Sequence, residues 1–298
     1  MHCYDKTIMD LRLLSAIFKK YFMKVNFSKI FLSHKGNLAD KWNSYLFVYD
    51  KTLSECAGRN INILEVGVNN GGSLEIWSKF FGSSSRIIGV DINKKCLEIN
   101  FSSANISLII GDSNLPETRK KINQECNYFD VIVDDGSHRS ADIINTFFNL
   151  LPLISGEGGI YIVEDLCCSY WQEFGGGIKN KFSAISFFKS LVDLINFQHW
   201  RSPFEFDEYL KEIVEDSSIV SEEAVIALKR IQDIKFVNSM CIVTFHNKKK
   251  DIGIGKRVMR GKISTVWRPP DKIQEIERVG RSQDNNIFNL PDINLFNN

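Results

Sequence analysis

The 298-residue sequence has no Cys-x-x-Cys spacing and no excess of charge of either sign. Its seven cysteines are an odd number, and the adjacent Cys167 and Cys168 are poorly placed to bridge each other. Neither a disulfide framework nor a zinc site is therefore expected, and a reducing cytoplasm is the simplest setting. Lys+Arg 37 against Asp+Glu 36 gives a formal net charge of +1, which offers no reason to expect a nucleic-acid partner.

The sequence also lacks a hydrophobic run long enough to cross a membrane, which takes about 20 mostly apolar residues. The apolar stretch 11–25 is interrupted by Arg12, Lys19, Lys20 and Lys24, and no small-residue cleavage site of a signal peptide follows it. We expect an amphipathic helix there that docks on the domain or on a second subunit, with weak contact to a membrane surface as the alternative.

From residue 61 onward the sequence alternates short apolar runs with helical patterns. The runs lie at 61–66, 86–91, 106–111, 129–134 and 159–164. Nearly continuous apolar runs of this length are typical of parallel strands that are buried on both faces. Together with the helical patterns between them, they predict a doubly wound α/β sheet with right-handed crossovers.

The alternation stops after the fifth run. A long insertion at 166–232 contains three consecutive glycines, and two further apolar runs follow at 234–240 and 241–246. Because so short a connection cannot be a helical crossover, we expect the last two runs to form an antiparallel hairpin at the sheet edge. Five parallel strands and a terminal hairpin make the seven-stranded, mostly parallel sheet of the Rossmann-like S-adenosylmethionine-dependent methyltransferases.

This pattern divides the chain into three parts. We expect an N-terminal helical extension at 1–55, a Rossmann-like methyltransferase domain at 56–250 and a polar C-terminal tail at 251–298. The insertion at 166–232 then lies within the domain as a lid over the substrate. The Asn-rich tail is expected to be loosely ordered or to form an oligomer contact, so a homo-oligomer is compatible with the sequence.

A glycine-containing loop, EVGVNNGGS at 65–73, follows the first expected strand. A dinucleotide-binding loop would carry glycines at positions 67, 69 and 72, and Asn69 does not fit that pattern. The acidic-x-Gly-x-x-x-Gly pattern resembles the loop that binds S-adenosylmethionine, although an ordinary strand-to-helix turn can contain the same residues.

Acidic residues also follow the next two strands. Asp91 can accept hydrogen bonds from both ribose hydroxyls, and Asp112 can hold an adenine amino group. Either aspartate alone could be a loop or cap residue, but the carboxyl ends of parallel strands face one crevice. The sequence thus predicts cofactor-binding residues at Glu65, Gly67, Asn69, Gly71, Ser73, Asp91, Asp112, Ser113 and Asp134.

The fourth strand is followed by DDGSH at 134–138 and the fifth by Glu164 and Asp165. Neighbouring strands would bring these four carboxylates together, where they repel one another unless a cation lies among them. Hard carboxylate oxygens favour Mg²⁺, Mn²⁺ or Ca²⁺ over zinc; the alternative is an Asp-Gly turn with acidic helix caps. His138 could accept a proton from a substrate hydroxyl, unless it is an exposed loop residue without a role.

Three stretches resemble the macrolide-sugar O-methyltransferases of the mycinamicin and macrocin type, together with related polysaccharide-cluster enzymes and proteins labelled cephalosporin hydroxylase. They are KWNSYLFVYDKTLS at 41–54, ILEVGVNNGGSLEIW at 63–77, and the region 134–177 with DDGSH, LPLISGEGGIYIVEDL and SYWQEFGGG. The resemblance covers residues 40–189, and more weakly the closing hairpin. The chain departs from the macrolide enzymes in its shorter amino-terminal region.

The resemblance implies an O-methyltransferase that uses S-adenosylmethionine and Mg²⁺ (or Mn²⁺) and acts on a sugar hydroxyl of a small molecule or saccharide. It implies metal ligands at Asp135, Glu164 and Asp165 and a general base at His138. We expect Tyr170 and Trp171 in the insertion to contact the sugar, although both could equally be core residues.

Two other classes of function stay open at this point. One is a hydroxylase-type oxidoreductase, for which the sequence supplies no iron site of two histidines and one carboxylate. The other is a non-catalytic nucleoside-binding module on the same fold, against which the intact Asp135, His138, Glu164 and Asp165 argue. No motif identifies the acceptor or the hydroxyl that receives the methyl group.

Overall fold

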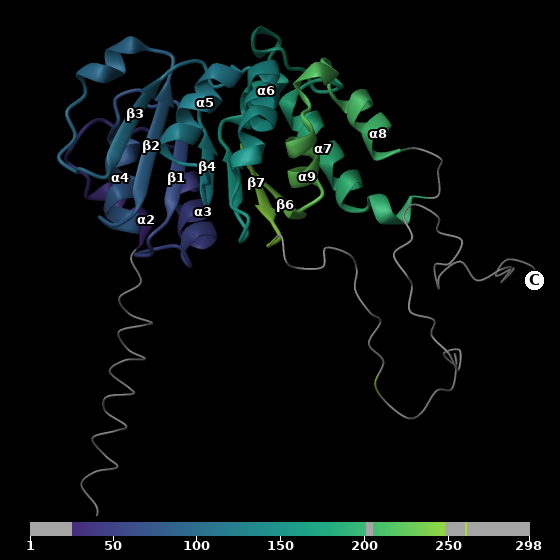
Figure 1. Cartoon of the computed structure of the whole chain (residues 1–298). Helices are drawn as coiled ribbons and strands as arrows, with labels where there is room; N and C mark the ends of the chain where they lie inside the picture. The colour runs from purple at the N-terminus through teal and green to yellow at the C-terminus, as the bar shows by residue number, and fades with distance from the viewer. Residues whose placement is uncertain (1–25, 201–204, 248–259, 261–298) are drawn as a thin grey trace, which may run out of the picture.

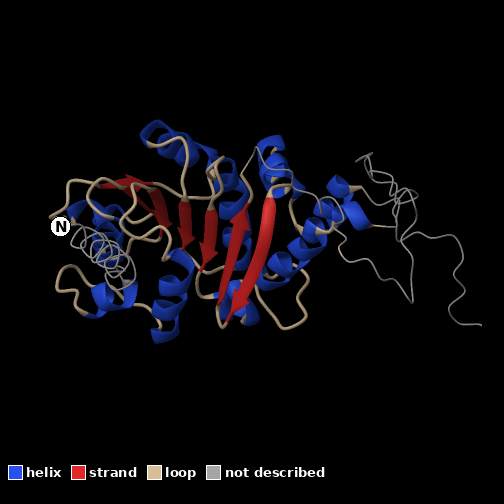
Figure 2. Ribbon diagram, turned by 90° about the horizontal axis from the view of Figure 1, so that it is seen from below, coloured by secondary structure: helices blue, strands red, loops and turns tan. Residues whose placement is uncertain are grey.

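The computed structural model describes residues 26–200, 205–247 and Arg260, and its centre is one seven-stranded sheet (Figures 1 and 2). The strands are β1 (Asn62–Val66), β2 (Arg86–Asp91), β3 (Ile106–Ile110), β4 (Val131–Asp134), β5 (Ile160–Val163), β6 (Ile231–Val237) and β7 (Met240–Phe245). Their order is β3-β2-β1-β4-β5-β7-β6. β1 to β5 pair in parallel, whereas β7 is antiparallel to β5 and β6. The predicted mostly parallel sheet with a terminal hairpin is confirmed.

The hairpin differs in register from the expectation. Its first strand is β6 at Ile231–Val237 and not 234–240, so the turn falls at Asn238 and Ser239. Ser239 has a left-handed backbone with φ 66°, and a positive φ at the second turn position occurs in type II turns. Asn238 and Ser239 are polar residues that favour turns and lie between two apolar stretches, a signal that the sequence analysis did not use. The insertion therefore ends at residue 230, two residues earlier than predicted.

Helices cover both faces of the sheet (Figure 2). On one face lie α2 (Phe27–Leu32), α3 (Asn43–Leu53) and α4 (Gly72–Phe81); on the other lie α5 (Pro116–Glu125), α6 (Ser140–Leu150), α7 (Ala184–Ile195), α8 (Phe206–Ile213) and α9 (Glu222–Leu228). Alternate strand residues point to opposite faces. Ile63, Ile87 and Val133 join the first core, while Leu64, Ile88 and Ile132 join the second. Burial on both faces explains why the parallel strands β1 to β5 are nearly continuous apolar runs.

The described part of the N-terminal extension is packed into the domain. Phe27 of α2 lies with its ring centroid 4.9 Å from Tyr49 of α3 and 4.6 Å from Trp77 of α4. All three aromatic side chains are fully buried. α2 and α3 thus belong to one core of the methyltransferase fold, and they fix the segment between them against the carboxyl ends of the strands.

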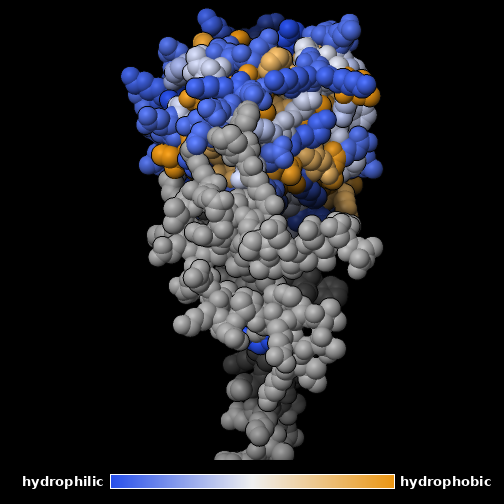
Figure 3. Space-filling view, turned by 90° about the vertical axis from the view of Figure 1, so that its right-hand side faces the viewer, coloured by the Kyte–Doolittle hydropathy of each residue, from blue (hydrophilic) through white to orange (hydrophobic). Residues whose placement is uncertain are grey.

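The amphipathic helix expected at 11–25 lies outside the described residues, as does the tail at 251–298 apart from Arg260. Among the described helices, none has the length and apolar character needed to cross a membrane. Viewed from the α8 side, the described surface is mainly hydrophilic with scattered apolar side chains (Figure 3).

Candidate active site

The glycine loop after β1 is shaped by left-handed backbone and by Asp91. Gly67, Asn69 and Gly71 have φ values of 91°, 49° and 80°. Asp91 Oδ2 accepts hydrogen bonds from the backbone N–H of Val68 at 2.8 Å and of Asn69 at 3.1 Å. The Asp91 carboxylate therefore holds the loop directly, in addition to the ribose contact that the sequence predicts for it.

Two glycines of this loop are required by the protein's own backbone. A Cβ atom on Gly67 would lie 2.1 Å from the carbonyl oxygen of Asp135, and one on Gly72 would lie 2.3 Å from that of Asn37. Gly67 thus lets β1 approach the loop after β4, and Gly72 lets the segment before α3 cross the start of α4. At both positions the missing side chain makes room for the backbone of the chain itself.

Gly67→Ala should therefore destabilise the protein strongly. The positive φ and the backbone clash together should lower the free energy of unfolding by at least about 3 kcal/mol, measured by urea denaturation. Gly58→Ala is the matched control, because Gly58 has φ 67° with nothing within 4 Å of the added Cβ. Its loss should be only about 1–2 kcal/mol. Equal losses for the two variants would contradict the contact between Gly67 and Asp135.

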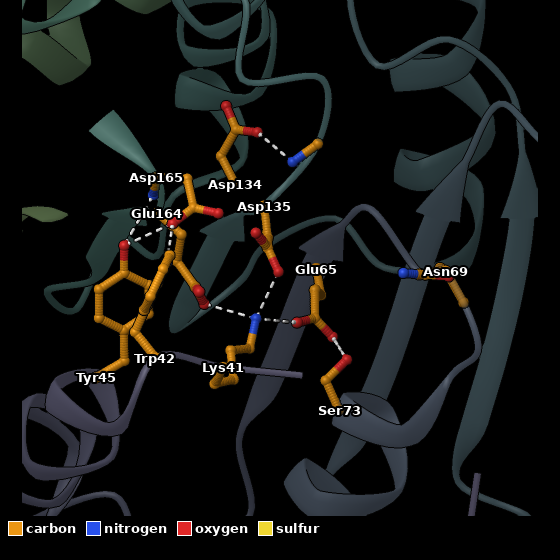
Figure 4. A network of polar contacts seen from close by, with 12 residues as sticks. Lys41, Trp42, Tyr45, Glu65, Asn69, Ser73, Asp134, Asp135, Glu164 and Asp165 are labelled. Atoms are coloured by element: carbon orange, nitrogen blue, oxygen red, sulfur yellow. Dashed lines mark hydrogen bonds and ion pairs between the residues drawn. The ribbon is translucent and has the colours of Figure 1, made fainter. Parts of the chain in front are cut away.

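The loops after β4 and β5 bring three predicted site residues together, of which Figure 4 shows Asp135 and Asp165. Asp135, His138 and Asp165 each offer one ligand atom, and these atoms lie within 4.8 Å of one another. His138 Nε2 is 3.8 Å from Asp165 Oδ2. His138 and Asp165 have φ values of 58° and 52°, a left-handed conformation that costs energy in residues other than glycine. Such strain is concentrated at functional sites, which fits the predicted roles of both residues.

Glu164 lies beside this group and faces a different partner. Its Oε1 is 2.7 Å from the ammonium of Lys41, and the same ammonium lies 2.5 Å from Asp135 Oδ2. Tyr49 also donates a hydrogen bond to Glu164 Oε1. Lys41 thus connects Asp135 to Glu164. Of the three predicted metal ligands, Asp135 and Asp165 lie within 4.8 Å of each other and of His138, whereas Glu164 is not part of this group.

Asp135, Glu164 and Asp165 form an acidic centre, and the segment 41–49 supplies its polar partners. The sequence analysis did not assign this role to the segment. Lys41 contacts Asp135 and Glu164, while Tyr49 donates to Glu164. The Trp42 indole donates to Asp165 Oδ1 at 3.0 Å, and the Tyr45 hydroxyl donates to the same oxygen at 2.7 Å. Tyr45 also accepts the backbone N–H of Asp165 at 3.2 Å. Tyr45 and Tyr49 are four residues apart, so they lie on one face of a helix. This spacing was the signal in the sequence that could have indicated a polar helix face toward the site.

Burial sets the charges of this centre. Glu65 and Glu164 are 0% and 1% exposed. Burial, partly offset by Lys41, raises the pKa of Glu65, and it raises the pKa of Glu164 to about 8. For Lys41, burial lowers the pKa, but the carboxylates of Glu164, Asp135 and Glu65 outweigh it and raise the pKa well above its ordinary value. The carboxylates around Lys41 therefore favour its charged ammonium form.

The remaining predicted residues lie around this centre. Glu65 Oε2 accepts the Ser73 hydroxyl at 2.7 Å, which links the end of β1 to α4. Asp112 Oδ1 accepts the backbone N–H of Asn114 at 2.9 Å, and the Ser113 hydroxyl lies 2.9 Å from that of Thr146. Tyr170 and Trp171 are both 47% exposed, so neither is a core residue.

Asp134 points away from the centre (Figure 4). It is 3% exposed, its Oδ1 accepts the backbone N–H of Gly136 at 3.3 Å, and its Oδ2 has no hydrogen-bond partner. Burial raises its pKa to about 7. These contacts favour a role in shaping the 134–138 loop, and the cofactor contact predicted for Asp134 stays a prediction.

The donor set suits a hard divalent cation. Asp135 and Asp165 offer carboxylate oxygens, the ligands that Mg²⁺ and Mn²⁺ prefer, and a His138 nitrogen lies within 4.8 Å of both. Both aspartates are partly exposed, so a cation could enter from the solvent side. The residues present therefore fit a cation held mainly by Asp135 and Asp165. Glu164 lies next to this pair and contacts the Lys41 ammonium.

The sheet order, the glycine loop after β1 and the acidic strand ends define the fold class of the Rossmann-like S-adenosylmethionine-dependent methyltransferases. A family model described as FtsJ-like methyltransferase matches residues 48–192, just under half of the chain. A solved structure of the MycE methyltransferase from the mycinamycin biosynthetic pathway, in complex with Mg and SAH, superposes with a TM-score of 0.62 at 24% identity. It covers 80% of this chain and 59% of that one, a likeness of fold.

Two curated relatives are named as O-methyltransferases, and the name of one includes a rhamnosyl group. The chain is 32% identical to demethylmacrocin O-methyltransferase of Streptomyces fradiae over 174 residues, which are 54% of this chain and 43% of the relative. It is 30% identical to the 8-demethyl-8-alpha-L-rhamnosyl tetracenomycin-C 2'-O-methyltransferase of Streptomyces olivaceus over 165 residues, 52% and 42% of the two chains. The chain thus matches less than half the length of either relative.

Proposed function

We propose that this chain is a divalent-metal-dependent O-methyltransferase that transfers the methyl group of S-adenosylmethionine to a sugar hydroxyl. The observation that carries the proposal is the meeting of Asp135, His138 and Asp165 at the carboxyl ends of β4 and β5, next to the glycine loop of a methyltransferase sheet. The names of the relatives, demethylmacrocin O-methyltransferase and a rhamnosyl tetracenomycin-C 2'-O-methyltransferase, support a sugar-containing acceptor.

The cofactor would lie across the carboxyl ends of β1 and β2, at the point where the strand order reverses between β1 and β4. Asp91 would accept from the ribose hydroxyls while it holds the loop N–H groups of Val68 and Asn69. Asp112 would face the adenine end. The sulfonium methyl would then be directed toward the loops that carry Asp135, His138 and Asp165.

Asp135, Glu164 and Asp165 would hold the cation, and His138 would take the proton. When bound, a divalent cation acts as a Lewis acid and makes a nearby hydroxyl easier to deprotonate. His138 Nε2, which lies on the Asp165 side of the site, accepts the hydroxyl proton. The acceptor oxygen forms a bond to the methyl carbon as the carbon–sulfur bond breaks, which leaves the thioether S-adenosylhomocysteine and a protonated His138. Trp42, Tyr170 and Trp171 are exposed and available to flank the sugar.

The test is a methyl-transfer screen with labelled S-adenosylmethionine and Mg²⁺ against nucleotide sugars, sugar-containing natural products and oligosaccharides. Transfer to a sugar hydroxyl that depends on Mg²⁺ is the expected result. Binding of nicotinamide dinucleotides, with no binding of S-adenosylmethionine or S-adenosylhomocysteine, would overturn the assignment.

Asp91→Ala should weaken S-adenosylhomocysteine binding, measured by calorimetry. Loss of hydrogen bonds to the ribose and of the two loop N–H contacts should cost about 1–3 kcal/mol, or about 5- to 150-fold in Kd. Asp216→Ala is the matched control, since Asp216 also accepts a backbone N–H, that of Ser218 at 2.9 Å, but lies on the exposed turn η6 (Ser217–Ile219). Unchanged affinity in Asp91→Ala would remove this residue from the cofactor site.

A further inference from the structure

Lys41 is an ammonium enclosed by carboxylates. Its side chain is 2% exposed and lies 2.5 Å from Asp135 Oδ2, 2.7 Å from Glu164 Oε1 and 3.7 Å from Glu65 Oε1. Two of these distances are those of charge-assisted hydrogen bonds, and the third is longer than a hydrogen bond. The ammonium is thus bound closely to two carboxylates and faces a third across a short gap (Figure 4).

The third carboxylate is incompletely satisfied. Glu65 is fully buried, its Oε2 accepts the Ser73 hydroxyl, and its Oε1 makes no hydrogen bond of normal geometry, although the Trp77 indole also favours the charged carboxylate. A buried carboxylate oxygen without a partner is costly. A shift of the Lys41 ammonium by about 1 Å would close this gap to hydrogen-bond distance. Glu65 therefore offers Lys41 a second binding position inside the same centre.

Asp135 and Glu164 are also two of the three carboxylates assigned to the cation under the proposed function. Two cations that share the same ligands repel each other, and in a buried site the repulsion is only weakly screened. A divalent cation can therefore engage these oxygens fully only if the ammonium gives way.

We propose that Lys41 is a positioning residue that holds Asp135 and Glu164 as their internal counter-ion, competes with the divalent cation for them, and moves toward Glu65 when the cation binds. The inference rests on the proposed function of this centre. It makes the cation affinity of the site a balance between three carboxylates and one ammonium. It also ties the cation to Glu65, whose other oxygen holds Ser73 at the start of α4.

Cation binding is measured directly, with Mn²⁺ and Mg²⁺ titrated calorimetrically into the full-length protein without cofactor or acceptor. Lys41→Met and Lys41→Gln should both bind Mn²⁺ at least about tenfold more tightly than wild type, because a competing charge is removed. Gln retains an amide donor for Asp135 and Glu164, so Lys41→Gln can still be measured if Lys41→Met fails to fold. Lys41→Arg keeps the charge and should bind within about threefold of wild type. Lys51→Met, an exposed lysine at the far end of α3, is the charge-matched control and should leave the affinity unchanged.

Glu65→Gln separates competition from general electrostatics. With Lys41 present, this variant removes the carboxylate toward which the Lys41 ammonium would move. Mn²⁺ binding should therefore weaken by at least about tenfold. In the Lys41→Gln background the same change should have a clearly smaller effect, since no ammonium needs the position. Equal effects in the two backgrounds would overturn the movement toward Glu65.

The outcomes separate this inference from the proposed function. If wild type binds no divalent cation, the metal dependence in the proposed function is wrong. If wild type binds Mn²⁺ while the folded Lys41→Gln and Lys41→Met bind it equally or more weakly, Lys41 is only a structural ion-pair partner, and the competition proposed here is wrong.

Discussion

His138→Ala should reduce methyl transfer by about 10²–10⁴-fold, the usual contribution of a positioned general base. The His138 imidazole belongs to the same group as Asp135 and Asp165, and its Nε2 lies 3.8 Å from Asp165 Oδ2. S-Adenosylhomocysteine affinity should stay within about twofold of wild type, because in the proposed function His138 would act on the acceptor and not on the nucleoside. Single-turnover rates and calorimetry measure the two quantities separately.

The left-handed backbone at His138, with φ 58°, calls for a second substitution. Asn adopts this conformation more readily than most residues, so His138→Asn keeps the loop geometry but cannot take up a proton. It should be as inactive as His138→Ala. His199→Ala, at an exposed histidine of η5 (Phe197–His199), should keep full activity. Near-native turnover in His138→Asn would show that the hydroxyl is activated without this base.

Removal of divalent cations should abolish turnover, and Asp165→Asn should reproduce most of that loss. EDTA should bring activity to background, with recovery on addition of Mg²⁺. Asp165→Asn should lower turnover by at least about 100-fold, because a Lewis acid contributes several kcal/mol to transition-state stabilisation and each 1.4 kcal/mol is a factor of ten. The amide oxygen can still accept from Trp42 and Tyr45 and tolerates φ 52°, so the melting temperature should change little.

Asp193→Asn is the matched control for this variant. Asp193 Oδ2 accepts the Tyr209 hydroxyl at 2.7 Å, so the substitution likewise removes a carboxylate charge from an Asp–Tyr pair, but on α7 away from the centre. Its turnover and its response to EDTA should match wild type. Full activity of the wild-type protein in EDTA would contradict the metal dependence.

The sequence by itself determined the sheet and the positions of the acidic strand ends. Strands buried on both faces must be apolar throughout, so the run at 86–91 was read correctly as β2 (Arg86–Asp91). Parallel strands present their carboxyl ends on one side, so Asp91, Asp135 and Asp165 could be expected in one crevice before any coordinates were known.

Only the tertiary structure decided which group each carboxylate contacts. Lys41 reaches Asp135 across 94 residues of sequence, and Tyr45 reaches Asp165 across 120. Such pairs depend on how α3 packs on the sheet, and no local pattern encodes that packing. The same packing explains Gly72, whose missing side chain makes room for the backbone at Asn37. Local periodicity specifies elements and the faces they bury, whereas the pairing of distant polar groups follows only once those elements are packed together.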